Sequence, residues 1–247
     1  MTPSSGIMIQ RLPTARGMMR FAVALLISAV ANSGAQDAHS RFGLVAGRVY
    51  SYSGTARWTD STQRVHSSPV RWHMDVLRVH ASSNARAALV RGWIQDLAWY
   101  SPGQRQQFTV LLEIRGTLYQ LAVGDSAAAI DTLIDAVRDA SAAARRSQLV
   151  IDSVLVVGRL YGQDVDRGDR NDDMYAWLVE SKARLSTRAG WTSLATDPTQ
   201  WRLVYRTLPD DQLLDFVPGV GITRFVYTHH GTVANTDVHL STVTSRR

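Results

Sequence analysis

The stretch that decides the fold is Val70–Val76, which reads VRWHMDV. Positions 70, 72, 74 and 76 carry apolar side chains, and the residues between them are polar or charged. Because successive side chains of a β-strand point to opposite faces, this alternation is typical of a strand with one face in a core and the other in water. The stretch therefore predicts a half-buried β-strand.

Extended segments continue on both sides of this strand. Upstream, residues 44–58 are rich in aromatic and β-branched side chains, and Tyr50 and Trp58 share one parity. Downstream, Gly and Pro occur where tight turns are expected, as at Ser101–Gly103. The further segments that we expect to be extended are 87–99, 108–115, 118–123, 174–185, 201–208, 212–217, 222–229 and 233–243, with a short apolar run at 149–157. We therefore expect about ten strands, joined by meander turns and a closing hairpin around His230-Gly231.

One segment carries a helical period instead. Apolar residues recur at positions 130, 133, 134, 137 and 140 of the segment 126–146, which places them on one face of a helix. Asp125 or Ser126 can cap its start, and two arginines suit the negative end of its dipole. We therefore expect one long amphipathic helix that packs on the sheet.

These segments together predict a mainly β fold of the α+β class. We expect a curved antiparallel sheet or half-barrel, with the helix on its concave side. Once a leader of 35 residues is set aside, residues 36–247 are enough for a single β-rich domain.

The first 35 residues have the features of a cleavable signal peptide. Arg11, Arg16 and Arg20 make a positive region without acids, and Phe21–Val30 is apolar but too short to span a bilayer. Small residues then lead to a cleavage site before Gln36. The sequence predicts export to the periplasm or the medium, with a product that does not span the membrane after cleavage. Translation starting at Met1 or at Met18 or Met19 gives the same expectation.

Charge and cysteine content narrow the partners. The formal charge is +6, and the signal peptide supplies three arginines and no acids, which leaves +3 spread over the mature chain. Without a clustered basic face we expect no nucleic-acid partner. The chain has no cysteine, so disulfides, thiolate sites and a lipid-modified cysteine anchor are excluded.

Polar clusters give only weak signals for a metal or a catalytic centre. Residues 164–173 are rich in Asp, but Gly168 and the intervening arginines do not fit a calcium loop. His229, His230 and His239 are the candidate metal ligands, with His239 across the expected hairpin from one of the others. No nucleophile motif is found, so we predict no catalytic residue and no cofactor.

Short motifs resemble those of uncharacterised exported bacterial proteins. These motifs are Gly47–Thr55, Asp173–Trp177, Phe216–Ile222 and His229–Thr232. The broader likeness, at the level of pattern, is to the half-barrel of periplasmic lipoprotein carriers and outer-membrane lipoprotein receptors. The resemblance implies the fold and the compartment, and it transfers no functional residue.

The aromatic residues suggest a function. If the sheet curls without filling its interior, Tyr50, Trp58, Trp72, Trp93 and Trp177 would line a cavity for an apolar or lipidic ligand. We therefore expect an exported, non-enzymatic protein that binds such a ligand. The alternatives are a protein-interaction module of the cell envelope, with an unknown protein partner, and a metal-dependent hydrolase whose histidines converge with Asp237 or the 164–173 loop.

Overall fold

The computed structural model describes residues 40–123, 126–162, 170, 172–185, 190–230 and 234–246. The predicted signal peptide lies outside the described residues, and Asp37–Arg247 form one unit. The strands are β1 (Arg48–Thr59), β2 (Val65–Ala81), β3 (Ala85–Arg91), β4 (Phe108–Ile114), β5 (Thr117–Ala122), β6 (Gln148–Ile151), β7 (Leu160–Tyr161), β8 (Trp177–Arg184), β9 (Thr199–Arg206), β10 (Asp210–Val217), β11 (Gly221–His229) and β12 (Ala234–Ser245). The helices are α3 (Ser126–Arg138) and α4 (Ala140–Arg145), with short 3₁₀ turns η1 (Ile94–Leu97) and η2 (Gly190–Leu194).

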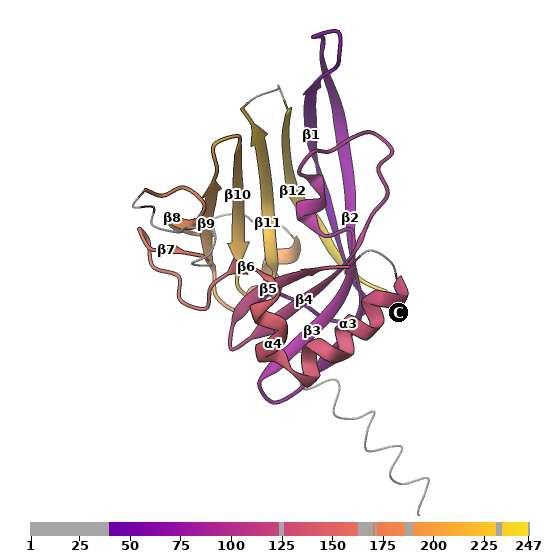
Figure 1. Cartoon of the computed structure of the whole chain (residues 1–247), viewed down its shortest axis with the longest axis vertical. Helices are drawn as coiled ribbons and strands as arrows, with labels where there is room; N and C mark the ends of the chain where they lie inside the picture. Colours follow the sequence, from indigo (N-terminus) through magenta and orange to yellow (C-terminus); the bar gives the residue numbers. More distant parts are fainter. Residues whose placement is uncertain are drawn as a thin grey trace, which may run out of the picture. The chain divides into compact units, whose positions relative to one another are not determined.

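The described strands form one 12-stranded sheet (Figure 1). Its order is β6-β5-β4-β3-β2-β1-β12-β11-β10-β9-β8-β7, so the first and last strands pair in the middle of the sheet. The ladders between neighbouring strands are antiparallel. The predicted mainly β, curved antiparallel fold is confirmed, including the hairpin of β11 and β12.

The two edges of the sheet, β6 and β7, are consecutive in the chain and share no backbone ladder in the described residues. A side chain joins them instead, because the Tyr161 hydroxyl donates to the Val150 carbonyl at 3.0 Å. Beside it, Arg159 pairs with Asp152 at 2.6 Å. The sheet is therefore curved and unclosed, with a seam held by side chains.

The main core fills the concave side of the sheet. It joins residues from strands that are far apart in the sheet, such as Tyr50 of β1, Leu111 of β4, Trp177 of β8 and Phe225 of β11. One end of this core is covered by the segment before β1, where Phe42 is 3% exposed. Burial of these aromatic and aliphatic surfaces is the main stabilising contribution to the fold.

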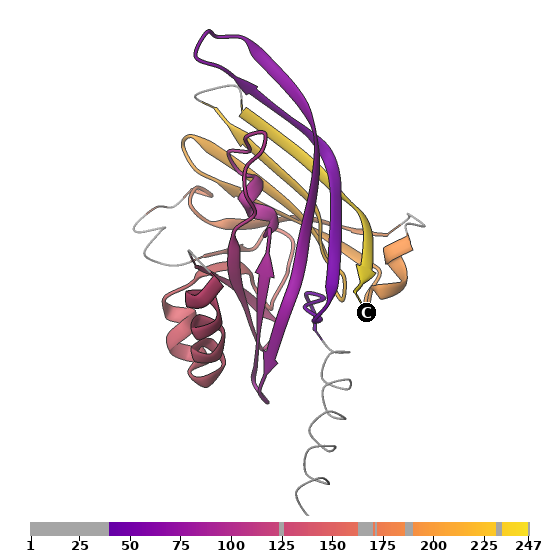
Figure 2. The ribbon, with the colours of Figure 1, turned by 90° about the vertical axis from the view of Figure 1, so that its right-hand side faces the viewer.

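The helices pack on the other, convex face, so the expected concave placement is wrong. Leu133 of α3 belongs to the same buried cluster as Ala87 and Leu89 of β3, whereas Ala88 and Val90 of β3 belong to the main core. Figure 2 shows α3 and α4 on the outer side of the strands β3 and β4. The physical reason is that β3 is buried on both faces, and its outer face therefore needs a cover.

The single expected helix is also divided in two. Asp139 leaves the helical conformation, with φ −132°, and its carboxylate accepts a hydrogen bond from the Ala142 backbone N–H. An Asp in this role is a preferred N-cap, because it satisfies a free donor of the next helix. The segment therefore forms α3 and a short second helix, α4.

The expected strand 87–99 ends early, and this positions the candidate site. β3 stops at Arg91 because Gly92 has φ +75°, and a Cβ there would lie 2.4 Å from the His73 carbonyl oxygen. The chain then folds back over the concave face, where Ile94 and Leu97 of η1 join the main core. No helix in the described part of the chain has the length and hydropathy needed to cross a membrane.

Candidate functional site

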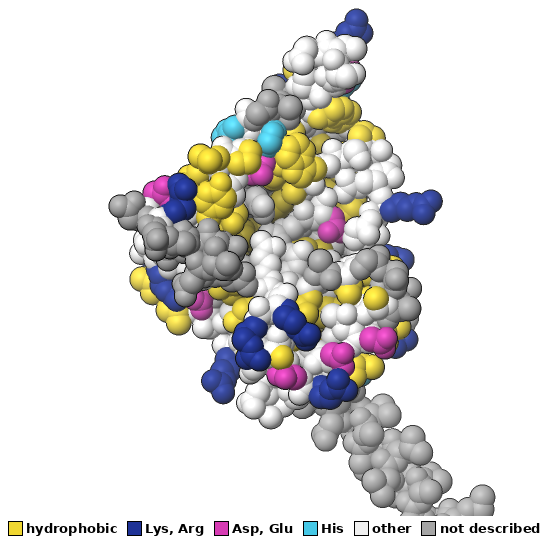
Figure 3. Space-filling view, viewed as in Figure 1, with side chains coloured by type: hydrophobic (Ala, Val, Ile, Leu, Met, Phe, Trp, Pro, Cys, Tyr) yellow, Lys and Arg dark blue, Asp and Glu magenta, His cyan; other side chains and the backbone are white. Residues whose placement is uncertain are grey.

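An aromatic pocket lies at the end of the concave face where the β1–β2 hairpin turns. It has a volume of about 160 Å³. We call this cavity the aromatic pocket. It is lined by Trp58, Thr59, Trp99, Tyr100, Ser101, Pro102 and Ala234. Figure 3 shows hydrophobic side chains gathered in the upper part of this face, beside histidine and acidic side chains.

Strand register explains why residues from distant parts of the sequence meet there. Trp58 of β1 pairs with Ala234 of β12, Ala234 pairs with His229 of β11, and His229 pairs with Asp210 of β10. Each of these four residues lies on the concave face of its strand, and adjacent strands are about 4.8 Å apart. The register therefore builds a row that runs from the aromatic pocket to an Asp–His pair.

Trp99 connects the pocket to this row. Its side chain is an exposed large hydrophobic group, and its residue is 55% exposed. The ring centroid lies 4.2 Å from that of His229 and 5.5 Å from that of Tyr227. Its backbone has φ +60°, a left-handed conformation that is rare for a bulky residue. An exposed indole in a strained conformation is typical of a functional position.

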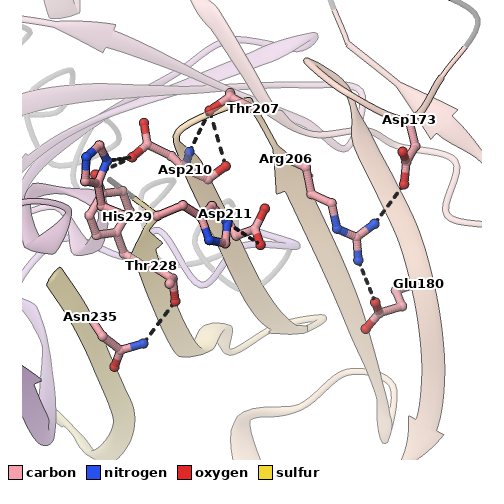
Figure 4. Close-up of polar contacts among 11 residues, drawn as sticks. Asp173, Glu180, Arg206, Thr207, Asp210, Asp211, Thr228, His229 and Asn235 are labelled. Carbon is pink, nitrogen blue, oxygen red and sulfur yellow. Dashed lines mark hydrogen bonds and ion pairs between the residues drawn. The ribbon is translucent and has the colours of Figure 1, made fainter. Parts of the chain in front are cut away.

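Asp210 anchors the polar side of the site. Its Oδ1 accepts hydrogen bonds from the Tyr227 hydroxyl and from His229 Nδ1, each at 2.7 Å. Burial, together with the hydrogen bond to Asp210, raises the pKa of Tyr227 above its usual range, so this phenol stays protonated. Figure 4 shows the Asp210 and His229 side chains side by side, with Thr207 hydrogen-bonded at the same turn.

A second Asp–His pair lies on the hairpin side of the pocket. His66 stacks on Trp58 with ring centroids 5.5 Å apart, and its Nε2 lies 2.7 Å from Asp60 Oδ2. The hydrogen bonds from His66 and from Thr62 hold the pKa of Asp60 well below its usual range, so Asp60 is ionised at neutral pH. Trp58 is therefore stacked on an imidazole and has a negative charge nearby.

Two buried side-chain oxygens have no hydrogen-bond partner among the described residues. They are Oγ1 of the lining residue Thr59 and Oδ2 of Asp96 in η1. Burial raises the pKa of Asp96 to about 6. A hydrogen bond from the Gln107 backbone acts in the opposite direction but is the smaller effect. Buried polar atoms without partners are costly and are often found at functional sites.

The five predicted ligand-binding aromatics fall into two groups. Trp58 lines the aromatic pocket. Tyr50, Trp72, Trp93 and Trp177 are each less than 5% exposed in the main core. The polar atoms of Tyr50, Trp72 and Trp93 have local partners; Trp72 Nε1, for example, donates to the Gly92 carbonyl at 2.8 Å. The cavity beside Trp93 measures about 10 Å³, close to the space of one water molecule.

The histidines proposed as metal ligands do not meet. His229 is on the concave face, and His239 pairs with Arg224, not with His229, so the expected opposition across the hairpin is wrong. His230 lies 3.1 Å from Asp211, and His239 lies 3.4 Å from Asp237. No group of three potential ligands is found within the described ranges.

The acidic 164–173 loop lies mostly outside the described residues. Of its described carboxylates, Asp172 pairs with Arg170. Asp173 pairs with Arg206 at 2.8 Å, and Arg206 also reaches Glu180 at 3.3 Å (Figure 4). Asp172 and Asp173 are therefore each paired with an arginine.

A larger, polar depression lies on the convex face. It measures about 230 Å³ and is lined by Arg184, Arg202 and Asp215, among others. Arg202 and Asp215 bind each other through two hydrogen bonds of 2.9 and 3.1 Å. Because its buried carboxylate is already satisfied, this depression is a weaker candidate than the aromatic pocket.

Sequence reasoning missed Trp99, Tyr100 and Asp210. Trp99 lies in the expected strand 87–99, and Asp210 lies between the expected strands 201–208 and 212–217. One signal was present: two adjacent aromatics directly before the turn Ser101–Gly103 cannot both face a core when side chains alternate. The partner of Asp210 becomes visible only with the register of β10 and β11.

Comparisons with known proteins leave the family open. No family model matches the chain, and no curated protein matches it. A crystal structure from Bacteroides fragilis, described as a candidate exported protein with a YmcC-like fold, is similar with a TM-score of 0.41 and 8% identity. The match covers 84% of this chain and 100% of that one. The proposed function therefore rests on the residues of the pocket and not on a relative.

Proposed function

We propose that this protein is exported by its N-terminal signal peptide and binds a small apolar or amphipathic ligand in the aromatic pocket, without catalysing a reaction on it. The observation that supports this most is Trp99, an exposed indole with a left-handed backbone beside a second indole, Trp58. Keeping an indole in water and in a rare conformation costs stability, and a binding role explains why that cost is tolerated.

The size of the pocket limits what it holds. Its volume of about 160 Å³ is below the roughly 300–1,000 Å³ of pockets that enclose a whole small-molecule ligand. One compact end of a ligand therefore enters between the rings, and the rest stays on the surface. This differs from a carrier that encloses a complete lipid.

Binding of the fluorescent probe N-phenyl-1-naphthylamine tests the proposal. We expect saturable binding that weakens at least about fivefold, or about 1 kcal/mol, in Trp58→Ala and Trp99→Ala, because each change removes one wall. Leu208→Ala is the matched control, since Leu208 is an apolar residue that is 72% exposed and is not part of the pocket lining. Equal binding by all four proteins would refute the pocket.

Export is tested separately. Mass spectrometry of the protein recovered from the periplasm or medium of an expressing bacterium should find an N-terminus at Gln36. An intact leader on a protein that stays in the cytoplasm would contradict the export part and leave the binding part untouched.

An envelope interaction module is the second candidate, and one surface favours it. Val154, Val156 and Val157, between β6 and β7, are 52%, 56% and 47% exposed. Three exposed valines within four positions are unusual on a protein surface that contacts only water. A photo-crosslinking residue at position 156 should capture one defined partner in cells, whereas one at the exposed Arg138 of α3 should not.

A further inference from the structure

We propose that the group held in the aromatic pocket is a trimethylammonium group, so that the ligand is cationic at this end. This rests on the proposed function and names the chemical class that the same pocket binds.

The first support comes from the ring faces. The π faces of Trp and Tyr attract cations, and aromatic cages of this kind bind quaternary ammonium groups. Elsewhere in this protein such faces already have a cation: Lys182 Nζ lies 5.6 Å from the ring centre of Trp201, and Arg170 lies 5.2 Å from that of Tyr175. At Trp58, Trp99 and Tyr100, no Lys or Arg of the described chain takes this position.

The second support is charge. The lining of the aromatic pocket contains no Lys or Arg. Two carboxylates lie one residue away from its indoles: Asp60 is bonded to His66, which stacks on Trp58, and Asp210 is bonded to His229, which contacts Trp99. A cation is attracted to this arrangement, and an anionic head group is repelled.

The third support is the match in size and polarity. A volume of about 160 Å³ suits a compact, nearly spherical group between the rings. The lining residue Thr59 adds a polar side chain, whose Oγ1 is buried and has no partner in the described residues. Aromatic faces and nearby carboxylates, in a pocket of this size, together favour a trimethylammonium group over a plain hydrocarbon end.

Two molecules of the same shape separate the effect of charge on binding from the effect of size. Choline and 3,3-dimethyl-1-butanol differ only in the central nitrogen, which is carbon in the alcohol. Titration of the full mature chain with each, followed by NMR or calorimetry, should give about tenfold tighter binding of choline, which corresponds to about 1.4 kcal/mol. Equal or tighter binding of the alcohol would overturn the cation proposal and leave the apolar pocket standing.

Variants test whether the preference for choline over the alcohol arises in the aromatic pocket. Trp99→Ala should abolish the difference between the two molecules, whereas Trp99→Phe keeps a ring and should keep part of it. Asp210→Asn should weaken choline about two- to threefold and leave the alcohol unchanged, because Asn still accepts the Tyr227 hydrogen bond. Asp131→Asn, on the exposed side of α3, is the charge-matched control and should change neither.

The outcomes separate the two proposals. If N-phenyl-1-naphthylamine binds in the pocket and choline does not, the cation proposal is wrong and the proposed function holds. If none of the three molecules binds, both fail. A choline preference that survives Trp99→Ala in a protein with wild-type circular dichroism would place the cation elsewhere and overturn the assignment to this pocket.

Discussion

The indole of Trp99 lies against the imidazole of His229, with ring centroids 4.2 Å apart and ring planes inclined by 52°. The two residues come from the β3–β4 connection and from the end of β11. Their contact fixes the folded-back connection over the concave face, where a Gln95 side chain also donates to Gln212 of β10 at 3.2 Å. The aromatic pocket therefore depends on a long-range contact and not on one hairpin.

The left-handed backbone of Trp99 gives a first prediction. Glycine adopts this conformation without a Cβ penalty, so Trp99→Gly should be more stable than Trp99→Ala by roughly 0.5–1 kcal/mol in urea unfolding. At Trp58, inside β1, the order should reverse, since glycine is unfavourable in a strand. A Trp99→Ala variant that is as stable as Trp99→Gly, or more stable, would show that Trp99 is not strained.

The Asp210–Tyr227 hydrogen bond gives a second prediction. Tyr227 is 1% exposed, so Asp210→Ala leaves a buried hydroxyl without its acceptor and should cost about 1–3 kcal/mol. Tyr227→Phe removes the donor as well, and the double variant should cost about 1 kcal/mol less than the sum of the single changes. Additive costs in the double-mutant cycle would mean that the two side chains are not coupled.

Asp96 predicts a dependence on pH. Burial raises its pKa from 3.8 to about 6, so the folded state holds the proton more tightly than the unfolded chain. Its contribution to the free energy of unfolding is therefore present below pH 4 and is lost as pH rises to about 6. Asp96→Asn should match the wild type at pH 4 and exceed it by about 1 kcal/mol at pH 7.5, allowing for partial exposure of the group.

The comparison needs only the difference between two proteins at each pH, which removes the effects of other titrating groups. Asp131→Asn serves as the reference for loss of an exposed carboxylate. Parallel stability curves for Asp96→Asn and the wild type would contradict a raised pKa of the Asp96 carboxyl in η1.

The seam between β6 and β7 gives a fourth prediction. Tyr161→Phe removes the hydrogen bond to the Val150 carbonyl and should cost about 1 kcal/mol. Amide exchange in β6 and β7 should quicken, while exchange in β1 and β12 at the centre should change less. Tyr119→Phe, on β5, is the control, because no hydrogen bond of its hydroxyl is seen in the described part. Uniform quickening across the sheet would show that the seam does not open locally.

The sequence predicts the strands well because burial on one face leaves a period-two pattern, as in Val70–Val76. It misplaces the helix because the choice of face depends on how β3 is buried. Residues Ala85–Val90 of β3 are buried on both sides, so the outer side also needs a cover. The pairing of the first and last strands is a long-range choice that local patterns do not encode. The period of the helix was visible, and its position on the convex face was not.

The site was predictable only in part for the same reason. Trp58 was recognised from its strand parity, and it lines the pocket. Trp99 and Asp210 acquire their roles from the fold of one connection and the register of two strands, neither of which follows from spacing. The buried aromatics show the converse: Trp177 has the same pattern as Trp58 but lies in the middle of the core, where packing fills the space.

Fluorine NMR of protein labelled with 5-fluorotryptophan tests the central claim most directly, because the chain has seven tryptophans that report from different places. On titration with choline, the resonances of Trp58 and Trp99 should shift together and saturate. The other five, Trp72, Trp93, Trp177, Trp191 and Trp201, should stay in place. Saturable shifts at those five with Trp58 and Trp99 unmoved, or no shift at any tryptophan, would contradict a ligand site in the aromatic pocket.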